Sequence, residues 1–320
     1  MSTQFFGHQR QVGYLNKVLQ KGTLAHAYLF YGPENVGKFT LAKLIAKYFY
    51  CEQAVKILEN DCHQCLPCRQ IDSDTHPQVA LLDLDHTLTS KKEIRKDIPI
   101  EDIRELKHVF AFAPESGKKR IAIINQADKM SEGAANAFLK LLEEPGEESL
   151  FILISPSQDL LPQTIVSRAQ PIAFYPLSSR QMFDFLGHKV QNPRQADELV
   201  RYSSGRPGRA ISYLENTGDL EKEKKFIADL EALLFQKEIP DIFVFSEKAS
   251  QDEDLKRKTA EYSLRLMRRR LLQEKLPAKS SILVKQLKNM ERINSLMETT
   301  NVNPRLALDA MLLEAKGVNI

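Results

Sequence analysis

The chain has 320 residues, 42% of them hydrophobic, which is enough for two or three domains with their own hydrophobic cores. Its 45 Lys and Arg residues against 42 Asp and Glu residues give a net charge of +3, so charge alone does not predict nucleic-acid binding. No apolar run reaches membrane-spanning length, and Met1–His8 carry neither the basic segment nor the apolar core of a secretion signal. We therefore expect a cytoplasmic protein with no membrane partner.

The first residues predict a turn and a helix ahead of a first strand. A turn at Gly7 is followed by apolar residues at helical spacing, which end near Gly22. An apolar run at Ala27–Tyr31 then predicts a strand. His26, directly before this run, has two interpretations: a contact with an adenine, or a structural role at the start of the strand.

A phosphate-binding loop is predicted between this strand and a second helix. Residues 32–38 read GPENVGK and match the pattern G-x-x-x-x-G-K, and apolar residues recur at helical spacing over Leu41–Phe49. Gly32 and Gly37 let backbone N–H groups point inward at an anion, and the helix amino terminus adds its positive dipole end. Lys38 is placed to reach the outer phosphates.

All four cysteines of the chain fall in one short segment, with the spacing C-x10-C-x2-C-x2-C: Cys51, Cys62, Cys65 and Cys68. Four thiolates that converge on one ion close a tetrahedral structural Zn²⁺ site. A redox C-x-x-C pair and unpaired thiols are the alternatives, while a cytoplasmic location disfavours stable disulfides. His63, inside the segment, could in principle replace Cys51 as a ligand.

The next part of the chain alternates between strands and helices. In chain order, the patterns predict a strand at Val79–Leu84, an exposed charged loop at 90–97, a helix at Ile100–Phe112, a turn at Ser116–Gly117, a strand from Arg120, a helix at 131–144 and a strand at Phe151–Ser155. The last of these strands is apolar throughout, as in a sheet covered on both faces. We therefore predict a parallel, doubly wound α/β domain.

The groups that would handle Mg²⁺ in a phosphate loop are missing from the sequence. Phe39 stands where Ser or Thr would offer a hydroxyl, and Thr40, about 100° further round the helix, faces elsewhere. After the strand at Arg120–Ile124, Asn125 replaces the Asp that would hold the metal and Gln126 replaces the Glu that would orient the attacking water. Because all three losses remove Mg²⁺ chemistry, we predict a degenerate nucleotide site without hydrolysis.

The remainder of the chain is predicted to be helical. Two short helices are expected at 178–186 and 194–203, followed by another that starts at Gly205–Ala210. From Asn216 to Leu313 apolar residues recur at helical spacing and no strand pattern appears. The basic run Arg265–Arg270 is either a solvated helix face, the interpretation we favour, or a contact with DNA phosphates or an acidic partner.

Several motifs together carry a resemblance to a known family: Phe30–Pro33 with Gly37 and Lys38, Ala135–Pro145, Ser167–Ala169, and the ending Asn303–Leu313. With these motifs the chain resembles the bacterial clamp-loader subunits of the AAA+ class, and most of all the delta-prime family of DNA polymerase III subunits. The resemblance covers essentially the whole chain. It implies an AAA+ P-loop domain at 1–176 with an inserted zinc module at 51–68, a small helical lid at 177–215, and an all-α collar or oligomerisation domain at 216–320.

The resemblance also implies a function and partners. The family is a non-catalytic part of the clamp loader in DNA replication, which helps gamma/tau-type ATPase subunits load the sliding clamp onto primed DNA. Its partners are the gamma/tau and delta subunits, primed DNA within the complex, and the clamp mainly through other subunits. Phe39, Asn125 and Gln126 favour this family over the ATPase type, so we expect no intrinsic ATPase activity and weak or no binding of ATP and Mg²⁺.

Individual residues take expected roles from the same resemblance. The family carries a four-cysteine zinc module, so Cys51 is favoured over His63 as a ligand. Arg168 matches the arginine supplied to a neighbour's ATP, although Ala169 departs from the usual Ser-Arg-Cys motif. Arg209 matches the lid arginine that meets the γ-phosphate, or is a solvated Arg, and Ser155 is either a polar sensor or part of a Ser-Pro turn. The degenerate nucleotide site would then comprise Gly32, Gly37, Lys38, Asn125, Gln126 and Arg209.

Two other functions stay open at this point. The chain could be an ATP-hydrolysing clamp-loader subunit of the gamma/tau type with unconventional residues, which an ATPase assay would reveal. It could instead be a nucleic-acid binder built around the zinc module, which salt-dependent binding of DNA would reveal.

Overall fold

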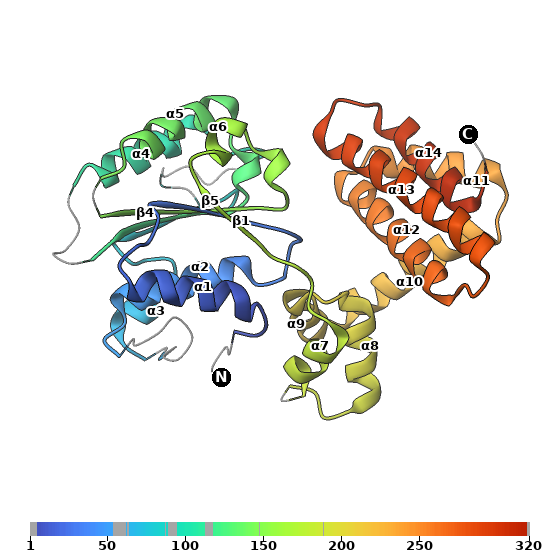
Figure 1. Ribbon diagram of the computed structural model, residues 1–320, viewed down its shortest axis with the longest axis horizontal. Coiled ribbons are helices and arrows are strands. Elements are labelled where there is room, and N and C mark those ends of the chain that lie inside the picture. The colour runs from blue at the N-terminus through green and yellow to red at the C-terminus, as the bar shows by residue number, and fades with distance from the viewer. Residues whose placement is uncertain are drawn as a thin grey trace. The chain divides into compact units, whose positions relative to one another are not determined.

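The structure is a computed structural model, and it describes residues 5–53, 62, 64–86, 88, 95–112, 118–146, 148–187 and 189–318. The chain divides into two compact units, residues 1–214 and residues 215–320 (Figure 1). The predicted lid segment at 177–215 falls almost wholly within the first unit. The finer division into 1–176, 177–215 and 216–320 stays a prediction.

A five-stranded parallel sheet organises the first unit. Its strands follow the order β2-β3-β4-β1-β5 and have these bounds: β1 Ala27–Tyr31, β2 Val79–Leu82, β3 Arg120–Ile124, β4 Ser149–Ser155 and β5 Gln170–Ala173. All four neighbouring pairs are parallel. The predicted parallel sheet is thus confirmed, and β5 is an additional edge strand that the sequence patterns did not reveal.

Helices cover both faces of this sheet, as Figure 1 shows. One face carries α1 (Gln9–Gln20), α2 (Lys38–Tyr50) and α3 (Leu66–Asp72), and the other carries α4 (Ile100–Phe110), α5 (Glu132–Glu143) and α6 (Gln163–Val166). Successive residues of a strand point to opposite faces, so Tyr28 and Phe30 join one hydrophobic cluster while Leu29 joins the other. This two-sided burial explains why β3 and β4 read as apolar throughout.

The first unit continues into a small group of helices: α7 (Ser179–Leu186), α8 (Pro193–Ser203) and α9 (Pro207–Glu215). A capping box of Ser178 and Gln181 starts α7, and the Asn192 side chain caps α8. The segments before α7 and α9 are joined, because Leu177 N–H donates to the Gly205 carbonyl at 2.7 Å. The predicted short helices are confirmed.

The regular secondary structure of the second unit, between residues 217 and 316, is entirely helical, with short connections between the helices. It consists of α10 (Thr217–Phe235), α11 (Ile239–Ser250), α12 (Glu253–Gln273), α13 (Pro277–Thr299) and α14 (Pro304–Lys316). These helices share one hydrophobic cluster whose most buried members include Leu230, Leu234, Ile242, Met290, Met311 and Leu312. The all-α prediction for this part of the chain is confirmed.

Some predictions concern parts of the chain outside the described residues. They are the loop at 90–97, apart from residues 95–97, the turn at Ser116–Gly117, and His63. Among the helices that are described, none combines the length and apolar character needed to cross a membrane.

Candidate functional site

The loop Gly32–Gly37 connects β1 to α2 and has the backbone shape of a phosphate loop. Gly32 (φ 134°), Asn35 (φ 61°) and Gly37 (φ 107°) all have positive φ angles, which curl the chain ahead of the helix. A Cβ atom on Gly32 would lie 2.1 Å from the Phe174 carbonyl oxygen, so this position requires glycine. The strand, loop and helix therefore stand in the arrangement that the sequence predicts.

Lys38 is buried and turns back onto this loop. Its ammonium group donates to the Gly32 carbonyl and, at 2.7 Å, to the Pro33 carbonyl. The pKa of Lys38 is lowered to about 8, chiefly by burial; Glu34 and Asp128 oppose this shift, and Arg206 adds to it. The carbonyl groups of the loop therefore hold the cation that would otherwise meet phosphate.

His8 contacts the phosphate loop through a buried hydrogen bond to its backbone, and the sequence patterns did not single it out. Its Nε2 atom lies 2.9 Å from the Val36 carbonyl oxygen, and its ring packs 4.8 Å from the ring of Phe174. Desolvation lowers the pKa of His8, although the bond to Val36 acts the other way. The only sequence signal was the Gly7-His8 turn, where His8 takes a left-handed φ of 52°.

Helix α9 closes against the same loop through Gly208. The Gly208 N–H donates to the Asn35 carbonyl oxygen at 3.0 Å, and a Cβ atom on Gly208 would lie 3.2 Å from that oxygen. Arg206, just before the helix, is close enough to lower the pKa of Lys38. Arg209 is half-buried in the first turn of α9, and its role at the nucleotide site stays a prediction.

The second half of the predicted nucleotide site lies at the end of β3. Asn125 continues the sheet with a backbone bond to the Leu82 carbonyl at 2.8 Å, and Gln126 takes a left-handed φ of 55°. Phe39 packs against the hydrophobic cluster on the α2 side, with the Lys43 ammonium 4.9 Å from its ring centroid. Neither Asn125 nor Gln126 offers a carboxylate, and Phe39 offers no hydroxyl.

Asp128 brings the nearest carboxylate after β3, and the sequence patterns did not reveal it. Burial raises the pKa of Asp128, while its own backbone, Lys129 and Ser155 act the other way. Its Oδ1 atom is buried and accepts no hydrogen bond from the described residues. Ser155, the candidate polar sensor, is also buried and donates its hydroxyl to the Ser157 carbonyl at 2.7 Å.

His26 lies at the amino end of β1, away from the phosphate loop. It precedes β1, whose carboxyl end leads into the phosphate loop, and the five residues of β1 span about 17 Å. Its Nε2 atom is buried without a hydrogen-bond partner among the described residues. Of the two interpretations, this position favours the structural one over contact with an adenine.

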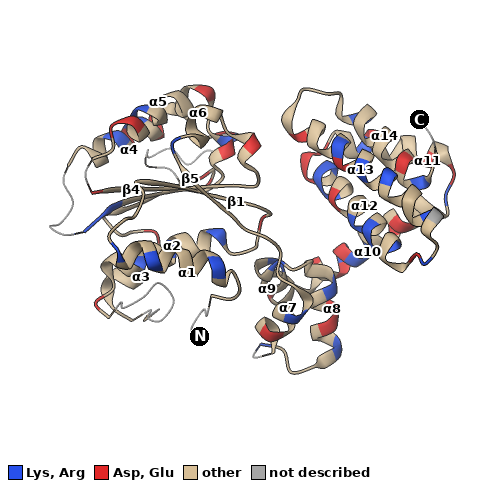
Figure 2. Ribbon diagram, in the orientation of Figure 1, with Lys and Arg blue, Asp and Glu red and all other residues tan. Residues whose placement is uncertain are grey.

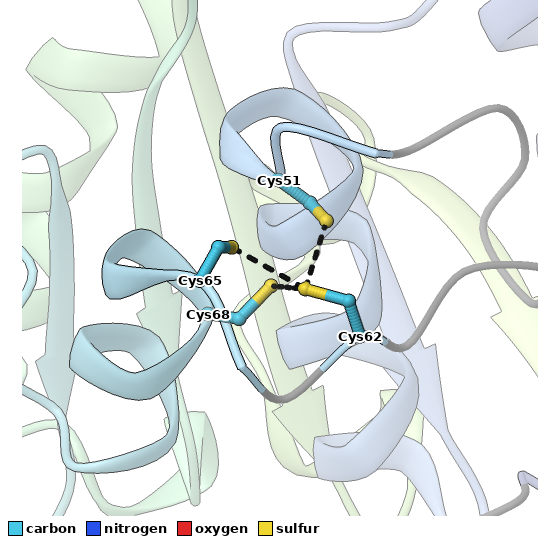
Figure 3. A group of neighbouring side chains, drawn as sticks. All are labelled: Cys51, Cys62, Cys65 and Cys68. Carbon is cyan, nitrogen blue, oxygen red and sulfur yellow. Dashed lines mark hydrogen bonds between the residues drawn. The ribbon is translucent and has the colours of Figure 1, made fainter.

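The four cysteines come together beside α2 and α3, as Figure 3 shows. Cys51 follows the last turn of α2, Cys62 lies in the connection, and Cys65 and Cys68 belong to the start of α3. The sulfur of Cys62 lies 3.4 Å from those of Cys51 and Cys65 and 3.6 Å from that of Cys68, and all four sulfurs lie within 4.8 Å of one another. Sulfurs bound to one tetrahedral Zn²⁺ at about 2.3 Å would be about 3.8 Å apart, so the cluster fits this ion.

The thiols of this cluster differ in acidity. Backbone N–H groups of Cys65 and Gln64 lower the pKa of Cys62 to about 6. Burial raises the pKa of Cys51 and of Cys68. A divalent cation bound here would hold all four sulfurs as thiolates, and His63 lies outside the described residues.

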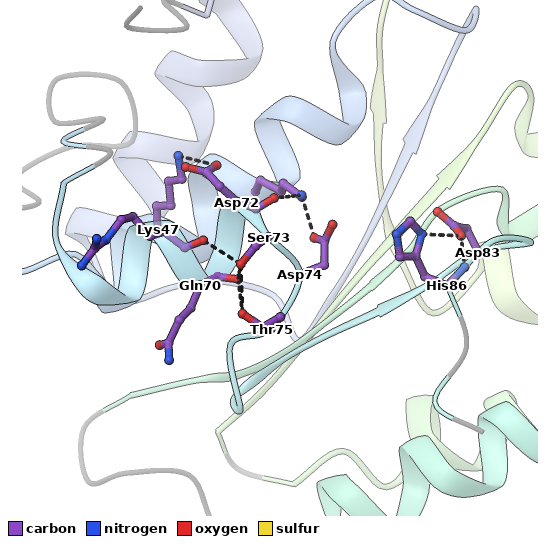
Figure 4. A network of polar contacts seen from close by, with 10 residues as sticks. Lys47, Gln70, Asp72, Ser73, Asp74, Thr75, Asp83 and His86 are labelled. Atoms are coloured by element: carbon purple, nitrogen blue, oxygen red, sulfur yellow. Dashed lines mark hydrogen bonds and ion pairs between the residues drawn. The ribbon is translucent and has the colours of Figure 1, made fainter. Parts of the chain in front are cut away.

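Helix α3 is fastened to α2 at its far end by two ion pairs. Lys47, itself buried, contacts Asp72 at 2.8 Å, and Lys43 contacts Asp74 at 2.6 Å. Figure 4 shows these groups beside the Ser73 and Thr75 hydroxyls, which lie 3.0 Å apart in the turn after α3. The cysteines at one end of α3 and the ion pairs at the other end both attach it to the helix that begins at Lys38.

Arg168 lies near the amino ends of the parallel strands, whereas the phosphate loop lies at their carboxyl ends. It comes between α6 and the edge strand β5, at the amino end where Gln170 pairs with Tyr28. Its guanidinium contacts the Glu143 carboxylate at 2.8 Å and donates to the Thr164 carbonyl at 3.0 Å. Both members of the ion pair are partly exposed, 37% for Arg168 and 50% for Glu143, so a partner could reach either group.

Comparison with known proteins identifies the family. A family model described as DNA polymerase III, delta subunit, matches residues 7–178, which is more than half of the chain. The delta-prime subunit of DNA polymerase III from Bacillus subtilis is 30% identical over 74% of this chain and 70% of its own length. The chain belongs to the delta-prime/clamp-loader family of DNA polymerase III subunits. The parallel sheet and the loop after β1 are accordingly those of a member of this family.

The clamp-loader family includes relatives with other names. The tau subunit of Bacillus subtilis is 34% identical over 52% of this chain, but the match covers only 27% of tau. A solved structure of a gamma subunit-related protein from Thermotoga maritima covers 96% of this chain and 99% of its own at 16% identity, with a TM-score of 0.40 that is too low to refine the assignment. Membership of the clamp-loader family alone therefore does not separate a delta-prime role from a gamma/tau role.

Proposed function

We propose that this chain is a non-catalytic subunit of the clamp loader, in the role of delta-prime. The observation that carries the proposal is the loss of all three groups that would handle Mg²⁺: Phe39 is partly buried against the core and has no hydroxyl, and Asn125 and Gln126, which follow β3, carry no charge. In phosphoryl transfer the bound Mg²⁺ neutralises the charge that develops on the phosphate, and a positioned side chain orients the attacking water. Lys38, which remains, bonds the carbonyls of its own loop.

A steady-state ATPase assay of the purified chain, with and without primed DNA, tests this proposal. We expect no turnover above that of a Lys38→Ala variant purified in the same way. The rival function, an ATP-hydrolysing subunit of the gamma/tau type, predicts phosphate release that co-purifies with the chain and disappears in the variant. That second result would overturn the proposal.

Arg168 is proposed to act on the ATP site of a neighbouring subunit. Its position at the amino end of the edge strand β5 supports this role, because its own phosphate loop lies at the carboxyl ends of the parallel strands. An arginine supplied in trans stabilises charge on the transferred phosphoryl group and contributes about 10³–10⁵ in rate. The ion pair with Glu143 is partly exposed and contributes roughly 0–1 kcal/mol, so it would not prevent Arg168 from engaging a neighbour.

The test uses a loader reconstituted with gamma-type ATPase subunits. We expect Arg168→Ala to leave assembly intact while DNA-stimulated ATP hydrolysis at the neighbouring site and clamp loading fall. Glu143→Gln is the matched control, because it breaks the same ion pair and keeps the arginine, so both rates should stay near those of the unmodified loader. Equal rates for all three loaders, with normal assembly, would show that Arg168 serves another purpose.

The cysteine cluster is proposed to hold one structural Zn²⁺ through Cys51, Cys62, Cys65 and Cys68. The separations between the four sulfurs support this, and the site leaves no open position for a reacting water. Metal analysis of protein purified without added metal should give about one zinc per chain. A zinc content near zero would rule the site out.

The partners and location belong to the same proposal. Gamma/tau-type and delta subunits would surround this chain, and primed DNA would be met within the complex, in the cytoplasm where the chromosome is copied. Binding of the isolated chain to DNA, strong and steeply dependent on salt, would instead favour a nucleic-acid binder built on the zinc module.

A further inference from the structure

The helical unit of residues 215–320 contains a pocket that the proposed function does not use. The pocket lies where the carboxyl ends of α10, α12 and α14 meet, and it has a volume of about 420 Å³. Leu234 and Phe235 of α10, Leu266, Arg269 and Arg270 of α12, and Lys316 of α14 line it. This volume falls in the range of pockets that enclose a small ligand or a few side chains.

Three apolar side chains line the pocket, and Phe235 is the one among them that is open to solvent. Leu234 is fully buried and Leu266 is 5% exposed, whereas the ring of Phe235 is 37% exposed. The Arg270 guanidinium stacks over this ring at 5.0 Å from its centroid. An apolar side chain that entered the pocket would therefore meet the exposed part of the Phe235 ring.

The rim of the pocket is cationic. Arg269, Arg270 and Lys316 face one carboxylate, Glu231, which pairs with Arg269 at 2.5 Å. Both members of this pair are about 40% exposed, 41% and 39%, so the pair is weakly held and an incoming carboxylate could exchange with it. Lys316 donates to the Lys237 carbonyl, just past the end of α10.

A structural role accounts for part of this arrangement. Helix carboxyl ends carry partial negative charge, and cations beside α10, α12 and α14 stabilise those ends. Stabilisation of the helix ends requires the positive charges. It requires neither a cavity of this size nor a partly exposed aromatic ring in the cavity wall. The combination of cations with a partly exposed aromatic ring indicates a ligand.

Nucleic acid is the less suitable ligand. The arginines of the run Arg265–Arg270 do not form one surface, because Arg268 pairs with Glu291 of α13 at 2.7 Å and Arg265 lies over the Tyr262 ring. Figure 2 shows acidic and basic residues interspersed along α12 and α13. A phosphodiester backbone would also meet the Glu231 carboxylate in the pocket, and its bulk favours an open groove over a small cavity.

We propose that this pocket binds an acidic peptide segment of a partner protein, with an apolar side chain of the peptide on Phe235 and its carboxylates at the rim. The exposed part of the Phe235 ring would receive the apolar side chain. Arg269, Arg270 and Lys316 would receive the carboxylates, which match the rim in charge. The inference concerns residues 231–316 alone and is independent of the nucleotide site.

Selection from a phage-displayed library of random dodecapeptides on the full-length chain tests the proposal. Peptides are counter-selected on an Arg270→Glu, Lys316→Glu double variant, and the survivors are synthesised with a fluorescent label for anisotropy titrations. The control variant is Arg268→Glu, which changes the same charge on the same helix but lies outside the pocket lining. Circular dichroism and thermal unfolding establish that each variant is folded, and Arg270→Gln replaces the double variant if that one is not.

We expect the surviving peptides to combine Asp or Glu with Leu, Ile or Phe, and their affinity to fall by about ten-fold or more in the pocket variant. The Arg268→Glu variant should bind them like the unmodified chain. The proposal is overturned if no peptide depends on Arg270 and Lys316, if the dependent peptides are not acidic, or if Arg268→Glu loses as much affinity. It is also overturned if the pocket variant loses affinity for a short DNA duplex while no acidic peptide binds.

Discussion

Lys38 illustrates how one residue keeps the position required by a motif while it makes different contacts. It stands at the start of α2, where a phosphate loop places its lysine, yet its ammonium group bonds the carbonyls of Gly32 and Pro33. The burial that permits these bonds also makes the positive charge costly, which is why the pKa of Lys38 falls to about 8. Lys38 is thus charged at neutral pH, but its burial makes the charged form less favourable than in the unfolded chain, and this difference affects the free energy of unfolding.

The expected consequence is a pH-dependent stability. Because the pKa of Lys38 is about 8 in the folded chain and about 10.5 unfolded, the unfolded chain binds more protons between these values, and stability rises with pH across this window. From pH 7 to pH 9 the free energy of unfolding should gain about 1 kcal/mol from this residue. Urea unfolding of the chain and of Lys38→Met at both pH values isolates the effect, since other groups contribute equally to both proteins. A stability difference between the two proteins that does not change with pH would contradict it.

At the scale of elements, α3 is held to α2 by two different kinds of contact. Its amino end carries Cys65 and Cys68, and the turn after its carboxyl end carries Asp74, while Asp72 is its last residue. Metal coordination would act on the first end and the ion pairs act on the second. Because Lys47 is buried, its pair with Asp72 is shielded from water on one side.

Removal of zinc should therefore loosen α3 from one end. Hydrogen exchange of the chain, before and after treatment with a strong zinc chelator, should show the largest gain at residues 64–68 and a smaller one at residues 70–74, while β1 and β4 keep their protection. Cys68→Ser should give the same pattern without chelator. Uniform exposure of the whole first unit would show instead that the metal supports the sheet.

The whole molecule consists of two units with separate cores. Among the described residues, the hydrophobic cluster of residues 230–315 draws on the second unit alone, and α14 contributes Met311, Leu312 and Ala315 to it. Internal polar pairs reinforce it, since Glu223 binds the Tyr262 hydroxyl and, at 2.9 Å, the Lys258 ammonium. Such a unit has what a separately folding domain needs.

Residues 215–320 are accordingly expected to fold alone. Expressed as a fragment, they should give a helical circular dichroism spectrum and one cooperative thermal transition. The same fragment carrying Leu312→Ala is the control, and its transition should lie lower because the side chain is fully buried, at a cost of about 2–5 kcal/mol. A fragment that shows no transition would mean that the first unit is needed for its fold.

The strands and helices of the chain were largely predictable because their signals are local. Ala27–Tyr31, the loop after it and the helices of the second unit follow from periodicity, glycine positions and proline positions. β5 was not predicted because Gln170–Ala173 is only four residues long and contains Pro171. This segment forms a strand through its pairing with β1. His8, Asp128 and Gly208 reach the nucleotide site through contacts between distant segments, which no local pattern encodes.

The bond between Gly208 and Asn35 has a consequence for how such a chain changes over generations. Both of its atoms belong to the backbone, so substitution of the Asn35 side chain leaves the acceptor in place, and only proline at position 208 removes the donor. Substitutions of the side chains around the loop therefore leave the hydrogen bond between the loop and α9 in place. A descendant with a hydroxyl at position 39 and carboxylates at positions 125 and 126 would therefore inherit the same backbone bond between the loop and α9.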